Sequence, residues 1–462
     1  MLLFVPVVIA FFTFTIYAEG LSENDVLLKA LSNNTDIRIH NLESQTDSLK
    51  LREVSSKRLP QVSLRGSGSL DDSISSANAS ATVSQTIPGG GTVFGTVEQS
   101  GGIQRSTSRS TSDRRYVAGV EQPLLRNAWS NSPVELGIQI TTINNELLSI
   151  GRRQRILSTL SDVRNLYWNA FERKELQRIQ ENQVTLTEEF MKSERERFVI
   201  GEASALDTLS AALQYANAKR NMLRIENESQ SSLYRLAAAL GVDASEVTIS
   251  QQQDVLIPDI GDPDELIDKA LKYDPQVKIF ERMQELTSLR IKQRRNDLLP
   301  ELNLRASYDY NPQPSQIPPL QPSGSGASIG FVLNYSLPSV STRSQIEQQE
   351  LSLKSEELSF EQHRLEQRYF LKELRDKWQQ DKEMLHYSNL SVDLAYKQYE
   401  ATKRGYELGT EDRLSLIKAQ NDLVAAEVTA IQAIIDLKRL QIVIEEITGT
   451  LFDRFGVYIN ES

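Results

Sequence analysis

Two short stretches decide the fold of this chain: residues 59–65 read LPQVSLR, and residues 299–305 read LPELNLR. In each stretch a helical pattern ends at Leu-Pro, because a residue that precedes proline avoids the α region. Alternating apolar and polar residues, which are typical of a strand, follow at once. We therefore expect Pro60 and Pro300 to mark two equivalent helix-to-strand transitions.

The duplication extends well beyond these stretches. Residues 30–65 align with residues 270–305 without a gap, at a constant offset of 240. A second ungapped register, at an offset of 208, aligns FVIG at 198–201 with YELG at 406–409. A supersecondary unit that is repeated in this way packs against copies of itself. The sequence thus predicts an assembly with repeated symmetry.

Composition excludes several classes of protein. The chain has 462 residues, of which 62 are acidic and 51 are basic. This excess of negative charge argues against a nucleic-acid binder, because such proteins bind phosphate through basic residues. Cysteine is absent, which rules out disulfides, thiol catalysis and thiolate metal sites. The three histidines, His40, His363 and His386, lie far apart in the sequence. We therefore expect no metal site and no cofactor.

The N-terminus has the pattern of a secretory signal. Residues 1–18 are nearly all apolar, and this run is too short for a comfortable membrane span, so we expect a signal peptide that is cleaved after Ala18. A buried N-terminal strand or helix is the alternative. Further along the chain, no run approaches the ~20 apolar residues that a transmembrane helix needs. If the protein enters a membrane, we expect strands to do so.

Helical and strand patterns alternate along the chain. Residues 22–58 predict one helix. Residues 61–122 and 301–337 contain alternating runs that predict strands, with a polar loop between Gly101 and Ser112. About ten residues with one apolar and one polar face are typical of a transmembrane β-barrel strand, although half-buried soluble strands share this pattern.

The first copy is longer than the second. From Pro60 to Gly201 there are 141 residues, whereas from Pro300 to Gly409 there are 109. Because the helical parts match in length, the 32 surplus residues belong to the strand segment. We interpret them as an additional β-hairpin around the turn at Pro88–Gly91. The sequence leaves open whether this hairpin joins the other strands or folds over them.

Long helices follow each strand segment. We expect outgoing helices over about 133–199 and 339–407, and returning helices over about 203–240 and 411–448. The last of these carries two heptad series, which are Leu416, Leu423, Ala430, Leu437 and Ile444, and Val428, Ile435 and Ile442. The series lie on nearly opposite sides of the helix. Such a helix suits a closed ring with a neighbour on each flank, or alternatively a bundle with one wide apolar face.

Strands that cross a membrane must close into a barrel, because an open sheet edge in lipid leaves backbone groups unpaired. The smallest such barrels have about eight strands. The four or six strands expected from one chain are too few, so closure requires an oligomer. Three chains would supply twelve or eighteen strands.

The order and duplication of these motifs resemble the TolC-like outer-membrane efflux family over nearly the whole mature chain. The resemblance rests on the Leu-Pro pairs, on QPLLR at 122–126 after the first strands, and on the two tips at 198–201 and 406–409. Each tip precedes an Ala- and Leu-rich helix that ends at Gly241 or Gly449.

This resemblance implies a mainly α-helical protein with β-strands, in which a tandem-repeat protomer forms one third of a trimeric transmembrane β-barrel continued by a long α-helical barrel. The implied organisation is a signal peptide (1–18), a first repeat (19–240, strands 61–122, tip near 201), an equatorial linker (241–265), a second repeat (266–450, strands 301–337, tip near 409) and a C-terminal tail (451–462).

The resemblance also implies a function. The homotrimer would lie in the outer membrane of a Gram-negative-type cell, in contact with its lipid, and extend into the periplasm. It would be a passive conduit that catalyses nothing. Its partners would be a periplasmic adaptor protein and an inner-membrane pump or secretion ATPase. The exported substrate, whether drug, metal or protein, does not follow from the sequence.

Candidate site residues cluster at the tips. By the resemblance, Arg197, Gly201, Asp207 and Gly409 would form the periplasmic tip that contacts the adaptor. The family's acidic constriction falls on Ser415 and Lys418, which are not acidic. We expect Glu411 and Asp412 nearby to form the entrance gate instead. The alternative is that they are acids at a helix N-terminus, favoured by its dipole.

Two other classes of function fit the sequence less well. An enzyme is disfavoured because the chain has no phosphate-binding glycine loop in a strand–helix setting, no His/Cys cluster and no nucleophile elbow. A periplasmic coiled-coil scaffold or adaptor without a membrane pore is the remaining alternative. Such adaptors have long helical hairpins, but not two full repeats with barrel-like strands.

Overall fold

The computed structural model describes residues 20–70, 74–104, 109–249, 263–312, 324–335 and 340–451, which form two compact units. The tip unit comprises Met1–His40, Arg153–Asp274 and Glu366–Ser462, and the strand unit comprises Asn41–Arg152 and Pro275–Leu365. The expected signal peptide (1–18), residues 250–262 of the expected linker and the tail from residue 452 lie outside the described residues.

The single helix expected over 22–58 is wrong, because the structure divides it at Asn34. Helix α1 (Glu23–Asn33) ends there and α2 (Thr35–Ser56) begins. The Asn34 side chain accepts hydrogen bonds from the backbone of Asp36 (2.9 Å) and Ile37 (3.1 Å), as an N-cap does. The break is itself duplicated, since α5 (Pro263–Tyr273) and α6 (Pro275–Asn296) are separated by one residue.

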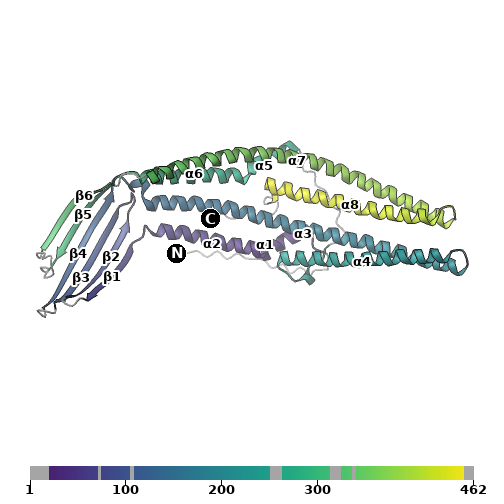
Figure 1. Cartoon of the computed structure of the whole chain (residues 1–462), viewed down its shortest axis with the longest axis horizontal. Coiled ribbons are helices and arrows are strands. Elements are labelled where there is room, and N and C mark those ends of the chain that lie inside the picture. The colour runs from purple at the N-terminus through teal and green to yellow at the C-terminus, as the bar shows by residue number, and fades with distance from the viewer. Residues whose placement is uncertain are drawn as a thin grey trace, which may run out of the picture. The chain divides into compact units, whose positions relative to one another are not determined.

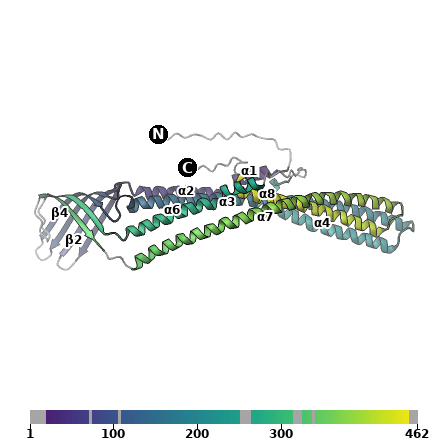
Figure 2. The same cartoon turned by 90° about the horizontal axis from the view of Figure 1, so that it is seen from above.

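Six strands form one antiparallel sheet in sequence order, drawn as a single curved layer in Figures 1 and 2. They are β1 (Gln61–Leu70), β2 (Ile74–Thr86), β3 (Thr92–Gln104), β4 (Arg109–Pro123), β5 (Glu301–Asn311) and β6 (Gly324–Asn334). Strand β4 pairs with β5, so the two repeats share one sheet. The polar loop expected between Gly101 and Ser112 is wrong at both ends, where β3 and β4 continue as strands, because backbone ladders form independently of side-chain type; residues 105–108 lie outside the described residues.

Two helical hairpins complete the fold, as Figure 1 shows. The first joins α3 (Pro133–Val199) to α4 (Ala205–Leu240), and the second joins α7 (Val340–Glu407) to α8 (Arg413–Thr448). Helices α4 and α8 begin two residues later than expected, because Ser204 and Asp412 are their N-caps. Two short 3₁₀ helices, η1 (Trp129–Asn131) and η2 (Ala244–Glu246), lie between the larger elements.

Helix α8 has neighbours on two flanks within the tip unit. Its residues Leu437 and Ile444 pack in one cluster with Trp378 of α7. Ile435 and Ile442, from the second heptad series, lie in another cluster with side chains of α1, α3 and α4. Both series of α8 therefore bury apolar side chains, as the two-neighbour interpretation expects.

A buried arginine links three helices of the tip unit. Arg164 of α3 is 1 % exposed. Its guanidinium lies 2.5 Å from Glu23 of α1 and 2.7 Å from Glu445 of α8. Since a buried charge is costly unless it is paired, these two carboxylates make the burial of Arg164 possible, and they tie both repeats to one helix.

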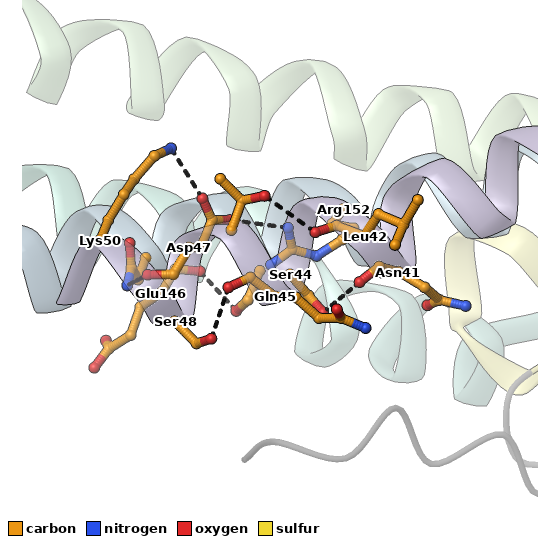
Figure 3. Close-up of polar contacts among 12 residues, drawn as sticks. Asn41, Leu42, Ser44, Gln45, Asp47, Ser48, Lys50, Glu146 and Arg152 are labelled. Carbon is orange, nitrogen blue, oxygen red and sulfur yellow. Dashed lines mark hydrogen bonds and ion pairs between the residues drawn. The ribbon is translucent and has the colours of Figure 1, made fainter. Parts of the chain in front are cut away.

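A second buried ion pair joins α2 to α3 in the strand unit. Asp47 lies 2.9 Å from Arg152 and 3.1 Å from Lys50, and Figure 3 shows its carboxylate between the two cations. Asn145 also donates to the Asp47 carbonyl at 2.8 Å. Burial alone would raise the pKa of Asp47, but the hydrogen bonds from Arg152 and Lys50 together hold that pKa below its usual range.

Replacing Asp47 with asparagine is expected to lower stability by about 1–3 kcal/mol, because Arg152 stays buried without an anion. The contribution of Asp47 is present above the ordinary carboxyl pKa and is lost as pH falls through its lowered folded value. Thermal unfolding at several pH values measures it, with the exposed Glu53→Gln on the same helix as the control. Equal effects of the two variants at neutral pH would contradict the prediction.

Candidate functional site

One face of the sheet is apolar and fully open within the single chain. The register sets Leu64 opposite Ala81, Val97 opposite Tyr116, and Leu304 opposite Phe331. Side chains alternate along a strand, so one row of every strand faces the same side. The exposed large apolar side chains of this face are Val62, Leu64, Leu70, Val83, Val93, Val97, Ile103, Tyr116, Tyr308, Tyr310, Ile329, Phe331 and Leu333.

The opposite face of the sheet is polar and cross-linked. Arg115 of β4 donates to Asp309 of β5 at 2.7 Å. Hydroxyl pairs connect further strands on this face, namely Ser69 with Ser76 (2.7 Å), Thr82 with Thr96 (3.0 Å) and Ser307 with Ser328 (3.0 Å). A sheet that is apolar on one side and polar on the other separates lipid from water when it closes.

Strands β1 and β6 are the two edges of the sheet, and every residue of both is exposed. Each edge presents a row of backbone donors and acceptors that can pair with another chain. Pro60 and Pro300 lie directly before the first residues of β1 and β5. The two prolines thus occupy equivalent positions between a helix and a strand.

The helices of the strand unit also expose apolar stripes. Leu42 and Leu49 of α2, seven residues apart, are 62 % and 60 % exposed. Leu351, Leu358 and Leu365 of α7 continue the same heptad spacing and are 54–64 % exposed. Helix α2 precedes edge strand β1, and α7 follows edge strand β6. Each open sheet edge is therefore next in the sequence to a helix that carries an open leucine stripe.

Each helical hairpin turns at a glycine. Gly201 and Gly409 have φ values of 82° and 75°, which favour glycine. In both turns the amide that follows the glycine donates back to the outgoing helix: Glu202 to Arg197 at 2.8 Å and Thr410 to Gly405 at 2.8 Å. This geometry accounts for both glycines without any partner.

Arg197 lies between the two tips and joins them. Its guanidinium donates to the Tyr406 hydroxyl at 2.6 Å and lies 5.3 Å from the centre of that ring. The Tyr406 hydroxyl in turn donates to the buried Glu194 carboxylate. Burial and this carboxylate raise the pKa of Tyr406 to about 12, so its hydroxyl keeps its proton.

Asp207 makes the second link between the tips. It closes a capping box with Ser204 at the start of α4 and lies 3.3 Å from Arg413 of α8. The hydrogen bonds from Ser204, and then the charges of Arg413 and Arg197, lower the pKa of Asp207. We call Glu194, Arg197, Asp207, Tyr406 and Arg413 the tip network. Sequence reasoning missed Glu194, Tyr406 and Arg413 as site residues; the alignment of the two tips carried the signal for Tyr406.

Glu411 and Asp412 lie in the second turn. Asp412 accepts from the backbone of Ser415 at 2.8 Å, as the N-cap of α8, and hydrogen bonds from the side chain and then the backbone of Ser415 lower the pKa of Asp412. The Glu411 side chain covers Gly405, where a Cβ atom would approach its Cγ to 2.6 Å. A side chain at Gly405, the position that corresponds to Arg197, would therefore require the Glu411 side chain to move. A gate role for Glu411 and Asp412 stays a prediction.

The tips also present apolar side chains to solvent. The most exposed, at 68–80 %, are Val199, Ile200, Leu206, Leu209, Leu408 and Leu414. They come from both hairpins of the tip unit. Contiguous exposed apolar side chains mark a surface that contacts another molecule.

Two kinds of feature are absent from the described part of the chain. No group of three or more His, Cys, Asp or Glu side chains is placed to hold a metal ion. No helix among those residues combines the length and the apolar character that a membrane crossing requires.

Comparison with known proteins gives a family match and a fold. Residues 266–450 match the family of outer membrane efflux proteins. The solved structure of the outer-membrane channel OprN is similar over 92 % of this chain and 89 % of its own, with a TM-score of 0.68 and 18 % identity. VceC of Vibrio cholerae, an outer membrane protein, is similar over 92 % and 96 %, with a TM-score of 0.69 and 12 % identity. No curated protein matches by sequence.

Proposed function

From the match of residues 266–450 to the family of outer membrane efflux proteins, we infer that this chain is the protomer of a trimeric channel in the outer membrane. We propose that the trimer is a passive conduit through which substrates leave the cell, across the periplasm and the outer membrane. The observation that carries this proposal is the six-stranded sheet with one open apolar face and two open edges.

Closure of the sheet explains the need for several copies. Six strands are fewer than the roughly eight of the smallest transmembrane barrels. When β1 of one copy pairs with β6 of the next, every edge is satisfied and the ring closes. The same contact brings the leucine stripe of α2 against the stripe of α7, which continues the ring through the helices. This agreement between strands and helices supports head-to-tail closure.

The tips are the proposed meeting point with other proteins. Their exposed apolar residues suit a periplasmic adaptor, which would connect the channel to an inner-membrane pump or secretion ATPase. Arg197, Gly201, Asp207 and Gly409 would shape this surface. We propose no catalytic role for any residue of the chain, because a conduit needs only a lining and a gate.

We propose that the tip network is the device that holds the entrance closed. It links the turn of α3–α4 to the turn of α7–α8 through hydrogen bonds and an ion pair. Because each of these bonds joins two hairpins that must separate if the entrance widens, breaking them favours the open state. Glu411 and Asp412 would then add negative charge at the rim.

The native mass of the mature protein, extracted from outer membranes in mild detergent, tests the proposal first. A trimer that forms conducting channels in planar bilayers is the expected result. A monomer that stays soluble without detergent would overturn it and favour the periplasmic scaffold. That outcome would mean that the apolar face of the sheet does not meet lipid.

A charge placed on each face of β5 gives a sharper test of the membrane role. Ala306 lies on the apolar face and Ser307 on the polar face, next to each other near the middle of the strand. Ala306→Arg is expected to destabilise the barrel by about 2–4 kcal/mol, because arginine at the bilayer midplane is costly, whereas Ser307→Arg faces water. The amount of trimer in outer membranes measures this difference. Equal assembly of both variants would count against a lipid-facing sheet.

A further inference from the structure

We propose that the additional hairpin β2–β3 is part of the barrel wall, so that the trimer has eighteen strands and a widened outer-membrane exit. This inference rests on the proposed trimeric channel and goes beyond it. Without the hairpin, three copies would contribute twelve strands. Three observations place the hairpin in the wall rather than across the lumen or outside the membrane.

The first observation is an unbroken ladder. Strand β2 pairs with β1 over ten residues and with β3 over thirteen, and β3 pairs with β4 over thirteen. For comparison, β4 pairs with β5 over eight residues and β5 pairs with β6 over eleven. A hairpin that folded away would leave β1 and β4 to pair with each other. In the structure they are separated by the whole hairpin.

The second observation is a continuous pair of faces. On β2 and β3, Ala81, Val83, Val93 and Val97 lie on the apolar face that runs across all six strands. The polar face of the hairpin carries mostly small hydroxyl side chains, among them Ser76, Ser80, Thr82, Ser84, Thr92 and Thr96, together with Asn78, Phe94 and Glu98. Hydroxyl side chains of this size line a lumen without filling it.

The third observation is that the turn of the hairpin is built into the fold. The Gly89 carbonyl accepts from the backbone of Trp129 at 2.8 Å and from the Gln122 side chain at 2.9 Å. Gly90 has φ +82°, and a Cβ there would lie 2.6 Å from the Asn127 carbonyl. Both Asn127 and Trp129 have positive φ themselves. A backbone held in this way anchors the turn beside the ends of β4 and η1.

The functional consequence is a wider exit. For strands ~4.8 Å apart and tilted by ~40°, eighteen strands give a backbone diameter of about 36 Å, against about 24 Å for twelve. The enclosed area differs by about twofold. The insertion therefore widens the outer-membrane part of the conduit, while the helical tips still decide whether the entrance is open.

Disulfide trapping tests whether β2 pairs with β1 and β3 with β4. Because the chain has no cysteine of its own, only the introduced pairs can form disulfides. The pair Leu64→Cys with Ala81→Cys, and the pair Val97→Cys with Tyr116→Cys, are expected to link in intact outer membranes under mild oxidation. Leu64→Cys with Tyr116→Cys is expected to stay reduced, because about three strand spacings exceed the reach of a disulfide. Linking of that last pair, with loss of the first two, would overturn the eighteen-strand barrel.

Labelling with a membrane-impermeant thiol reagent tests whether the residues of β2 alternate between lipid and the lumen, as they do in a barrel wall. Thr82→Cys is expected to react in permeabilised cells, whereas Ala81→Cys is expected to react only after denaturation. The controls are Ser307→Cys and Ala306→Cys on β5, which belong to the wall in a twelve-stranded barrel too. If Ser307→Cys reacts and Ala306→Cys does not, while both β2 variants react, only the eighteen-strand inference is overturned. If the two β5 controls react equally, the proposed membrane channel is overturned together with the eighteen-strand inference.

Discussion

Replacing Arg164 with methionine is expected to destabilise the protein by about 3–5 kcal/mol, because it removes the buried guanidinium that pairs with both Glu23 and Glu445. Both carboxylates lie within 2.7 Å of the guanidinium, and their side chains are 14 % and 16 % exposed. The loss of stability is therefore expected to affect both repeats, because Glu23 belongs to the first and Glu445 to the second.

The measurement is the thermal unfolding midpoint of the purified protein in detergent, followed by circular dichroism. Arg173→Met is the matched control, because it lies on the same helix and its ion pair with Glu228 is about one-third exposed. An exposed pair of this kind contributes about 0–1 kcal/mol. If Arg164→Met unfolds at the same temperature as the control, the buried network does not hold the tip unit together.

The second large effect is expected at the tips. Combining Tyr406→Phe with Arg413→Ala removes the hydroxyl that bridges Arg197 and Glu194, and the ion pair to Asp207. Hydrogen bonds to charged groups are each worth about 1.5–3 kcal/mol. Losing about 3 kcal/mol from the closed state shifts the closed-to-open equilibrium by roughly 100-fold. Single-channel conductance in planar bilayers is expected to rise several-fold.

Two further variants make this test specific. Arg195→Ala removes an exposed charge from the same region of α3 and is expected to leave conductance unchanged. Glu411→Gln with Asp412→Asn retains the helix cap, since asparagine caps as well as aspartate, but removes the rim charge. If this pair opens the channel and the Tyr406/Arg413 pair does not, the acidic rim is the gate and the tip network is structural.

Local sequence rules predicted much of the fold. Leu-Pro predicted the strand starts after residues 60 and 300, because proline restricts its predecessor wherever it stands. The heptads of α8 predicted neighbours on two flanks, because helical period fixes which side chains share a side. The break at Asn34 was missed, because an asparagine cap inside a helical pattern gives no periodic signal.

The candidate site was only partly predictable. The two tip glycines follow from the repeated motif, and Arg197 and Asp207 follow from the family resemblance. Tyr406 and Arg413 lie about 200 residues from the partners that they contact, and Glu194 was hidden among the many acids of α3. The pairing of such residues depends on how two hairpins pack side by side. A single sequence carries no record of that packing.

The sequence alone predicted the helix-to-strand transitions and the alternating faces of the strands, because these depend on residues close together in the chain. It also revealed the duplicated unit and the surplus in the first repeat, because the two copies can be aligned without knowing their structure. The tertiary structure alone decided that β4 pairs with β5, that the surplus hairpin lies within one six-stranded sheet, and that Arg164 is buried between two acids from different repeats. These features arise from contacts between distant segments, whose partners are chosen by packing and backbone pairing in three dimensions.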